Sequence, residues 1–186
     1  MNPTSNKKDF EDLSTTLKDL AYSYIEKYSP SKQQLKVYLM KKILTKFKSS
    51  KSKKEISELI DLVINNLEKN RLLNDELYSD SKSRMLLRRG YSLNKINQSL
   101  RIKGIDQKFI KQSIEKIKSK EIEPDFVSAL KLCKRRRIGA IRPKANRELF
   151  YKKDMGVLAR AGFDYDLSKR VLNLEQDEFQ KLIKIV

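Results

Sequence analysis

The sequence contains no histidine and only one cysteine, which removes the side chains on which several classes of site depend. Histidine and cysteine are the usual ligands of protein-bound transition metals, and histidine is the usual base of nucleophilic triads. We therefore expect no metal centre and no cofactor. The lone Cys133 has no partner for an intramolecular disulfide and falls on an apolar helical phase, so we interpret it as a small buried hydrophobe.

Loops that bind phosphates are absent too. The chain has neither a GxxxxGK[ST] loop nor a GxGxxG turn, which argues against nucleotide hydrolysis and dinucleotide binding. Acidic residues such as Asp75, Glu76, Asp164 and Asp166 can in principle hold Mg²⁺, but at helix starts such residues more often cap the helix and complement its dipole. The sequence therefore favours a protein that is not an enzyme, and an Mg²⁺-dependent nuclease is the enzymatic alternative.

Glycine and proline are scarce, with 5 and 4 residues among 186, and this composition argues against the many turns of an all-β fold. Lysine, leucine, isoleucine and glutamate dominate instead, and they favour an all-α fold. No run of about 18 apolar residues occurs, and the first residues lack the apolar region of a signal peptide. We expect a cytoplasmic protein that does not contact a membrane.

Positive charge is what the sequence has in excess. The chain carries 42 Lys and Arg against 24 Asp and Glu, a formal net charge of +18. Residues 1–70, 71–120 and 121–186 carry net charges of +5, +8 and +5, so the excess lies in the folded body and not in one tail. Such a surface attracts polyanions, and salt-sensitive binding to nucleic acid is the expected consequence. The alternative is a lysine-rich protein whose charged helix faces are merely solvated.

Apolar residues recur at helical spacing along most of the chain, and a three-helix pattern is repeated three times. Near the end of the second and third copies, a glycine stops one helix and an aspartate starts the next, as in Gly104-Ile105-Asp106 and Gly162-Phe163-Asp164. The expected apolar helix positions include Leu44, Leu77 and Leu149. The predicted divisions are a flexible lead over 1–12, a first three-helix repeat over 13–74 with a polar linker over 48–54, a second repeat over 75–122, and a third over 123–186 with a short extra helix over 175–185.

Tandem helical modules that pack mainly on their neighbours form an elongated, curved molecule, and this is the architecture we expect. Arginine gathers on its second and third modules although lysine dominates the chain. A guanidinium binds phosphates and carboxylates in a bidentate manner, so these clusters are the predicted site for a partner or for DNA. Its residues are Arg84, Arg88, Arg89, Arg101, Lys103, Lys134, Arg135, Arg136, Arg137, Arg142, Lys144 and Arg147. Merely solvated faces are the alternative, and four aromatic residues near the clusters, Tyr78, Tyr91, Phe150 and Tyr151, are candidates for stacking on bases or for ordinary packing.

Three sequence motifs and their order along the chain resemble the RecX family of recombination regulators, and the resemblance covers roughly residues 15 to 175. The best anchors are LLND at 72–75, RRGYSLNKINQSLRIKGID at 88–106 and LARAGFDYDLSKRVL at 158–172. A Lys- and Ser-rich insert near 45–55 enlarges the first module relative to the family pattern. The family commonly has an aspartate pair where this chain has Asn74-Asp75.

The resemblance implies a cytoplasmic modulator, mainly an inhibitor, of the RecA recombinase in DNA repair, recombination and the SOS response. Such a protein lies in the groove of a RecA filament on DNA, bridges neighbouring protomers, and alters strand exchange, ATP turnover and filament stability. The partners implied are the RecA filament and single-stranded or double-stranded DNA, bound by a monomer without a cofactor. The alternative is a stand-alone basic helical protein that binds single-stranded DNA or RNA without a recombinase.

Overall fold

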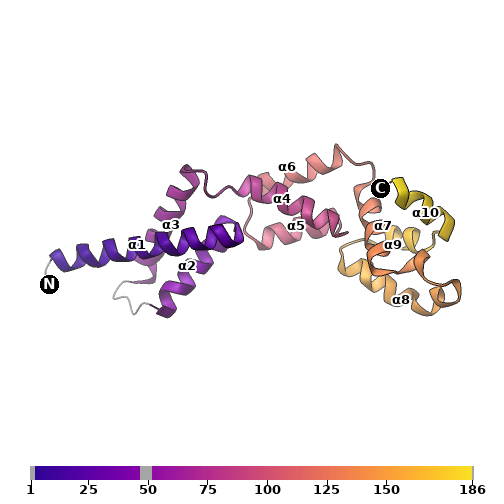
Figure 1. Cartoon of the computed structure of the whole chain (residues 1–186), viewed down its shortest axis with the longest axis horizontal. Coiled ribbons are helices and arrows are strands. Elements are labelled where there is room, and N and C mark those ends of the chain that lie inside the picture. Colours follow the sequence, from indigo (N-terminus) through magenta and orange to yellow (C-terminus); the bar gives the residue numbers. More distant parts are fainter. Residues whose placement is uncertain (1–2, 47–51, 186) are drawn as a thin grey trace. The chain divides into compact units, whose positions relative to one another are not determined.

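The computed structural model describes residues 3–46 and 52–185, and the side chains of residues 13–45 and 52–185. Within these ranges the chain forms ten α-helices, a short 3₁₀ helix and no strand, so the all-α prediction is confirmed (Figure 1). No helix in the described part is long and apolar enough to cross a membrane. The elements are α1 (Pro3–Tyr28), α2 (Lys32–Lys46), α3 (Lys53–Lys69), α4 (Asp75–Arg88), α5 (Leu93–Ile102), α6 (Gln107–Lys118), α7 (Pro124–Arg136), η1 (Gly139–Ile141), α8 (Lys144–Arg160), α9 (Tyr165–Leu172) and α10 (Gln176–Ile185).

The chain divides into two compact units. The first runs to Tyr78 and includes Lys103–Asp106, and the second comprises Ser79–Ile102 and the residues from Gln107 onward. These units are defined by packing, so they do not test the division into three sequence repeats, which stays a prediction.

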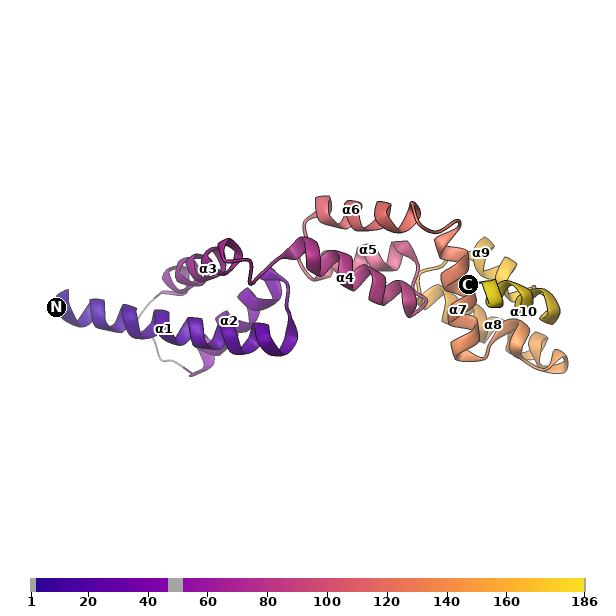
Figure 2. The same cartoon turned by 45° about the horizontal axis from the view of Figure 1, so that its top comes forward.

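The first unit is built on α1, α2 and α3, which pack against one another (Figure 2). Helix α1 contributes Leu13, Leu17 and Ala21, whose spacing of four residues puts them on one face, and all three are buried. Helix α3 begins with a capping box, in which the Ser52 hydroxyl accepts from the Glu55 N–H and the Glu55 carboxylate accepts from the Ser52 N–H. The helix therefore starts inside the predicted polar linker, most of which lies outside the described residues.

Helix α1 also begins earlier than its apolar pattern predicts, at Pro3 instead of near Leu13. Three positions that were expected on apolar faces are largely exposed: Leu44 at 50%, Leu77 at 66% and Leu149 at 77%. Helical periodicity places these residues correctly in helices, but it does not say whether a neighbouring element covers them.

The core of the second unit lies among α7, α8, α9 and α10. Phe179 is the anchor of α10 and is 1% exposed, while Leu182 and Ile183 pack at the edge of the same core. Burying such an aromatic side chain contributes roughly 2–3 kcal/mol, so the short last helix is held by packing and not by its own length. The remaining buried apolar side chains of this core are Phe126, Ala129, Leu130, Leu132, Cys133, Ile138, Ala140, Leu158, Ala161, Phe163, Val171, Leu172 and Leu174.

Helices α4 and α6 meet through small polar side chains. The buried Ser113 hydroxyl lies 2.8 Å from the Ser79 hydroxyl and 2.7 Å from Asp80 Oδ1, and Lys116 pairs with the other carboxylate oxygen at 2.6 Å. Burial raises the pKa of Asp80, but the hydrogen bonds from Lys116 and Ser113 outweigh it and hold the pKa below its ordinary value. Serine lets the two backbones approach closely while its hydroxyl stays hydrogen-bonded.

A polar joint occurs twice, at the start of α2 and at the start of α5. At α2, the Ser31 hydroxyl accepts from the Gln34 N–H at 3.2 Å and donates to the Lys103 carbonyl at 2.7 Å, while the Lys32 N–H donates to Asp75 Oδ1 at 2.9 Å. Each joint thus fastens the start of one helix to a later turn and to an aspartate at the start of another helix.

At α5, the Ser92 hydroxyl accepts from the Lys95 N–H at 3.1 Å and donates to the Gly162 carbonyl at 2.8 Å, while the Leu93 N–H donates to Asp125 Oδ1 at 2.7 Å. Burial raises the pKa of Asp125 despite this hydrogen bond, and Asp75 shows the same shift for the same reason. The two joints lie in different compact units and use the same three bonds.

Glycine is required at both joints. Gly162 has φ +93°, and an added Cβ would lie 2.4 Å from the Ser92 hydroxyl oxygen. Gly104 has φ +72°, and its Cβ would lie 2.4 Å from Gln33 Cβ. Gly104 and Gly162 each supply a left-handed turn and also the space into which the start of α2 or α5 packs.

Candidate nucleic-acid interface

The arginines at the end of α4 project into solvent because of the helix register. Leu86 and Leu87 are buried, so Arg84, Arg88 and Arg89 fall on the outer side and are exposed. Arg101 near the end of α5 is exposed as well. The predicted Lys103 is half-buried and belongs to the first compact unit, whereas every other predicted residue belongs to the second.

A second group of cations surrounds the end of α7. Lys134, Arg135 and Arg136 occupy the last helical turn, where positive charge complements the helix dipole. Arg137 follows in the left-handed region with φ 54°, and its N–H donates to the Cys133 and Lys134 carbonyls. All four side chains are exposed.

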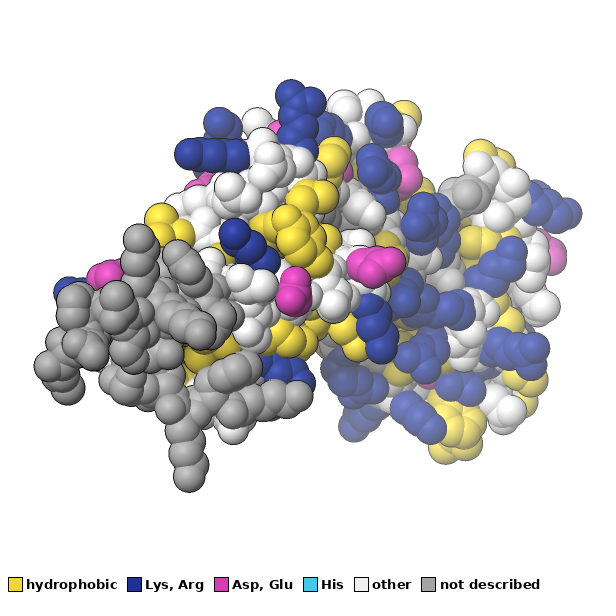
Figure 3. All heavy atoms as spheres, turned by 60° about the vertical axis from the view of Figure 1, so that its left-hand side comes forward, with side chains coloured by type: hydrophobic (Ala, Val, Ile, Leu, Met, Phe, Trp, Pro, Cys, Tyr) yellow, Lys and Arg dark blue, Asp and Glu magenta, His cyan; other side chains and the backbone are white. Residues whose placement is uncertain are grey.

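Most of these cations have no internal partner. Among the residues that the structure describes, none of Arg88, Arg89, Arg101 and Lys134–Arg137 forms an ion pair. Figure 3 shows one face of the molecule, on which Lys and Arg side chains far outnumber Asp and Glu. The guanidinium groups of these arginines and the ammonium group of Lys134 are therefore available to an anionic partner.

Arg142 is committed to the fold. Its Nε and one terminal nitrogen donate to the two oxygens of Asp154, each at 2.7 Å, and the Gly139 N–H donates to the same carboxylate at 3.1 Å. Asp154 is 2% exposed, whereas the Arg142 side chain keeps 22% of its surface exposed. The hydrogen bonds to Asp154 hold the pKa of Arg142 above its ordinary value. This bidentate pair ties η1 to α8.

Arg147 is also occupied within the protein. Its guanidinium donates to the carbonyls of Arg142, Ala140 and Leu174 at 3.3, 2.7 and 3.4 Å, and lies 3.8 Å from the Glu175 carboxylate. These bonds connect α8 with η1 and with the segment between α9 and α10. Arg142 and Arg147 therefore stabilise the fold, which their sequence context did not indicate. A binding role for either residue stays a prediction.

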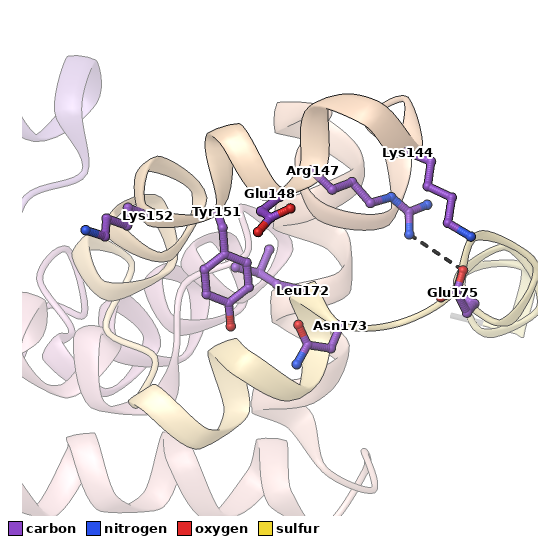
Figure 4. Close-up of a pocket in the computed structure, with 8 residues that line it drawn as sticks. All are labelled: Lys144, Arg147, Glu148, Tyr151, Lys152, Leu172, Asn173 and Glu175. Carbon is purple, nitrogen blue, oxygen red and sulfur yellow. Dashed lines mark ion pairs between the residues drawn. The ribbon is translucent and has the colours of Figure 1, made fainter.

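The four aromatic candidates have different surroundings. The Tyr78 hydroxyl donates to Gln34 at 2.9 Å, Tyr91 packs at the edge of the core, and the Phe150 ring is covered by the Arg142 guanidinium, 4.5 Å from its centroid. Tyr151 packs at the edge of the same core, and it also lines a hollow of about 530 Å³ between α8 and the end of α9 (Figure 4). Predicted site residues Lys144 and Arg147 line the same hollow.

The remaining sequence candidates lie at structural positions. Cys133 is fully buried, and burial, followed by the nearby Asp154 charge, raises the pKa of its thiol to about 12. Asp164 caps α9, since its carboxylate accepts from the Leu167 N–H at 2.8 Å. Asp75 caps α2 and not its own helix. In the described part of the chain, no group of three or more Cys, Asp or Glu residues is arranged to hold a metal ion.

Comparison with known proteins gives two relatives with the same name. The chain is 29% identical to "Regulatory protein RecX" of Myxococcus xanthus over 161 residues, which cover 86% of this chain and 85% of the relative. It is 30% identical to "Regulatory protein RecX" of Clostridioides difficile over 141 residues, which cover 72% of this chain and 62% of the relative. No protein-family profile matches the chain, and no solved structure matches it significantly.

The match to the Myxococcus xanthus relative leaves about 25 of the 186 residues of this chain outside the alignment. The three motifs that carry the resemblance span residues 72 to 172, at the centre of the chain. Motifs and overall similarity therefore agree, and the chain is similar to regulatory proteins of the RecX family.

Proposed function

We propose that this protein regulates, mainly by inhibition, a RecA-type recombinase by binding in the groove of the recombinase filament on DNA. Similarity to two proteins named "Regulatory protein RecX" supports the choice of partner. The observation that carries the proposal is the set of exposed arginines on α4, α5 and α7, which have no ion-pair partner among the described residues. A filament groove lined by acidic side chains and DNA phosphates would supply partners for them.

Binding alone is sufficient for such regulation. A ligand that contacts adjacent protomers changes filament stability by the difference in its affinity for the filament states. In this proposal the protein acts as a cytoplasmic monomer made of three tandem repeats, which together span neighbouring protomers, and it catalyses no reaction. Arg84, Arg88, Arg89 and Arg135–Arg137 make the principal contacts.

The test is DNA-dependent ATP hydrolysis and strand exchange by RecA with increasing amounts of this protein. We expect both activities to fall at stoichiometric protein. The variant R84Q/R88Q/R89Q is expected to weaken the effect strongly, whereas K69Q/K181Q/K184Q removes the same charge from exposed positions elsewhere and is expected to retain it. No effect of the wild-type protein at stoichiometric amounts would refute the proposal.

The stand-alone alternative predicts a different result in the same samples. Steeply salt-dependent binding to naked DNA or RNA, with no change in recombinase activity, would favour it. Electron microscopy of RecA filaments separates the two directly, since added density in the groove is expected only if the filament is the partner.

A further inference from the structure

The hollow beside Tyr151 has the chemistry of a site for a nucleobase. It measures about 530 Å³ and lies between α8 and the segment that links α9 to α10, within the second compact unit. This volume is in the range of pockets that hold small ligands. Figure 4 shows the Tyr151 ring beside Leu172, with Glu148 and Asn173 around it and with Lys144 and Lys152 toward opposite ends.

The walls of the hollow are held in place. The Arg147 guanidinium donates to three backbone carbonyls, from η1, from the residue after it and from Leu174 in the α9–α10 segment. Leu172 is buried in the core at 5% exposure, which fixes the apolar floor. A site whose walls are already ordered loses little conformational entropy when a ligand enters.

Each side chain in the hollow matches a part of a nucleotide. An aromatic ring beside an aliphatic floor offers a stacking surface to any base, and ammonium groups at the two ends can meet the phosphates before and after it. Asn173 offers both a donor and an acceptor to a base edge, and the Glu148 carboxylate accepts from an exocyclic amine such as that of cytosine. Thymine has no such amine.

The acidic residues argue against two other occupants. Glu148 and Glu175 line the hollow together with Lys144, Arg147 and Lys152, so a free phosphate or an acidic peptide would meet carboxylates as well as cations. A neutral base avoids repulsion by the carboxylates. The negative charges of its strand lie on the phosphates, which Lys144 and Lys152 would contact in this arrangement.

We infer that this hollow binds one base of a single DNA strand, by stacking on Tyr151 and by hydrogen bonds from an amino-bearing base to Glu148 and Asn173. The assignment to DNA rests on the proposed function, in which the partner filament carries a DNA strand. The site is separate in its chemistry from the exposed arginines, which contact phosphates without distinguishing bases.

The experiment measures fluorescence anisotropy of labelled 12-mers: oligo-dC, oligo-dT and an abasic strand with the same phosphates. We expect the wild-type protein to bind oligo-dC at least fivefold more tightly than the abasic strand, and more tightly than oligo-dT. Tyr151→Leu keeps apolar volume but removes the stacking ring, so it should lower the affinity for oligo-dC about fivefold or more and leave the affinity for the abasic strand unchanged. Tyr165→Leu, at a residue that is 64% exposed and outside the hollow, is the matched control and should change neither affinity.

Several results would overturn the inference. Equal affinity of the wild type for oligo-dC and the abasic strand would show that no base is recognised. The same conclusion would follow if Tyr151→Leu, shown to be folded by circular dichroism, kept the wild-type ratio of affinities. Glu148→Gln provides a second test, because it should reduce the preference for oligo-dC over oligo-dT without unfolding an exposed helix position.

Competition separates the other occupants. An oligo-Glu peptide that displaces oligo-dC from the wild type more readily than from Tyr151→Leu would assign the hollow to acidic peptides, and tighter binding of oligo-rC than of oligo-dC would assign it to RNA. Failure of the proposed function is distinguishable, since R84Q/R88Q/R89Q should weaken binding to the dC and abasic strands by the same factor. Base recognition without any effect on RecA would leave the inference standing and refute the regulatory function.

Discussion

Replacing Arg142 by methionine should destabilise the second unit, and the loss follows from the contacts of Asp154. In the wild type, this carboxylate is 2% exposed and accepts from Arg142 twice and from the Gly139 N–H once. Methionine keeps most of the aliphatic stem but leaves a buried charge with one backbone donor. Removing one partner of a buried pair costs about 3–5 kcal/mol. Since Arg142 is 22% exposed and water can reach part of its place, we expect about 2–4 kcal/mol.

Urea unfolding followed by far-ultraviolet circular dichroism measures this loss, and hydrogen exchange of the α8 amides locates it. The corresponding fall in melting temperature is about 5–15 °C. Asp154→Asn removes the charge, so the double variant R142M/D154N should recover at least half of the free energy lost in R142M. Their coupling energy then measures the pair itself.

The exposed Arg136 in the last turn of α7 is the matched control, and Arg136→Gln should change the free energy of unfolding by less than about 0.5 kcal/mol. If Arg142→Met were equally harmless, Arg142 would be free to bind a partner and the structural assignment would be wrong. The stability measurement is also a control for binding experiments. Reduced binding by an Arg142 variant reports on a lost contact only well below the melting temperature of that variant.

Two further predictions concern the joint at the start of α5. Asp125→Asn keeps an acceptor for the Leu93 N–H and removes a carboxylate whose pKa is raised by burial, so the folded wild type binds this proton more tightly than the unfolded chain does. The contribution of the Asp125 carboxyl to stability therefore falls as the pH rises above 3.8. The free energy of unfolding of the variant should equal or exceed that of the wild type at pH 7, and this advantage should disappear near pH 4. An advantage that grows toward acidic pH would contradict this prediction. Gly162→Ala should lower the free energy of unfolding by at least about 2 kcal/mol, because the added methyl group would meet the Ser92 hydroxyl. Gly156→Ala lies within α8, where the added methyl group would lie 3.4 Å from the flexible end of a side chain, and it should raise the free energy of unfolding by about 0.5–1 kcal/mol. Thermal unfolding that shifts both variants in one direction would refute the distinction.

The sequence was sufficient for most helix boundaries in the second half of the chain, because caps and glycines mark them. The cap at Asp164 lies where the pattern placed it, at the start of α9. Such signals are local, since an ordinary N-cap such as Asp164 binds an N–H group three residues later.

The parts that the sequence did not reveal depend on contacts between distant residues. Arg142 and Asp154 are 12 positions apart, and nothing in the local pattern distinguishes Asp154 from an ordinary solvated aspartate. For the same reason Arg142 and Arg147 were grouped with the exposed arginines, although the fold uses their donors. The exposure of Leu149 and the hollow beside Tyr151 likewise depend on which element covers α8, and helical periodicity does not contain that information.

The first N–H groups of α2 and α5 are bound by aspartates from later segments of the chain, and this affects how the chain folds as it is synthesised. The Lys32 N–H donates to an aspartate 43 positions later, and the Leu93 N–H donates to one 32 positions later. A growing polypeptide thus emerges from the ribosome with the start of each of these helices incomplete until the following segment has been synthesised. During translation these hydrogen bonds therefore form in chain order, because each needs an aspartate from a segment that is synthesised later.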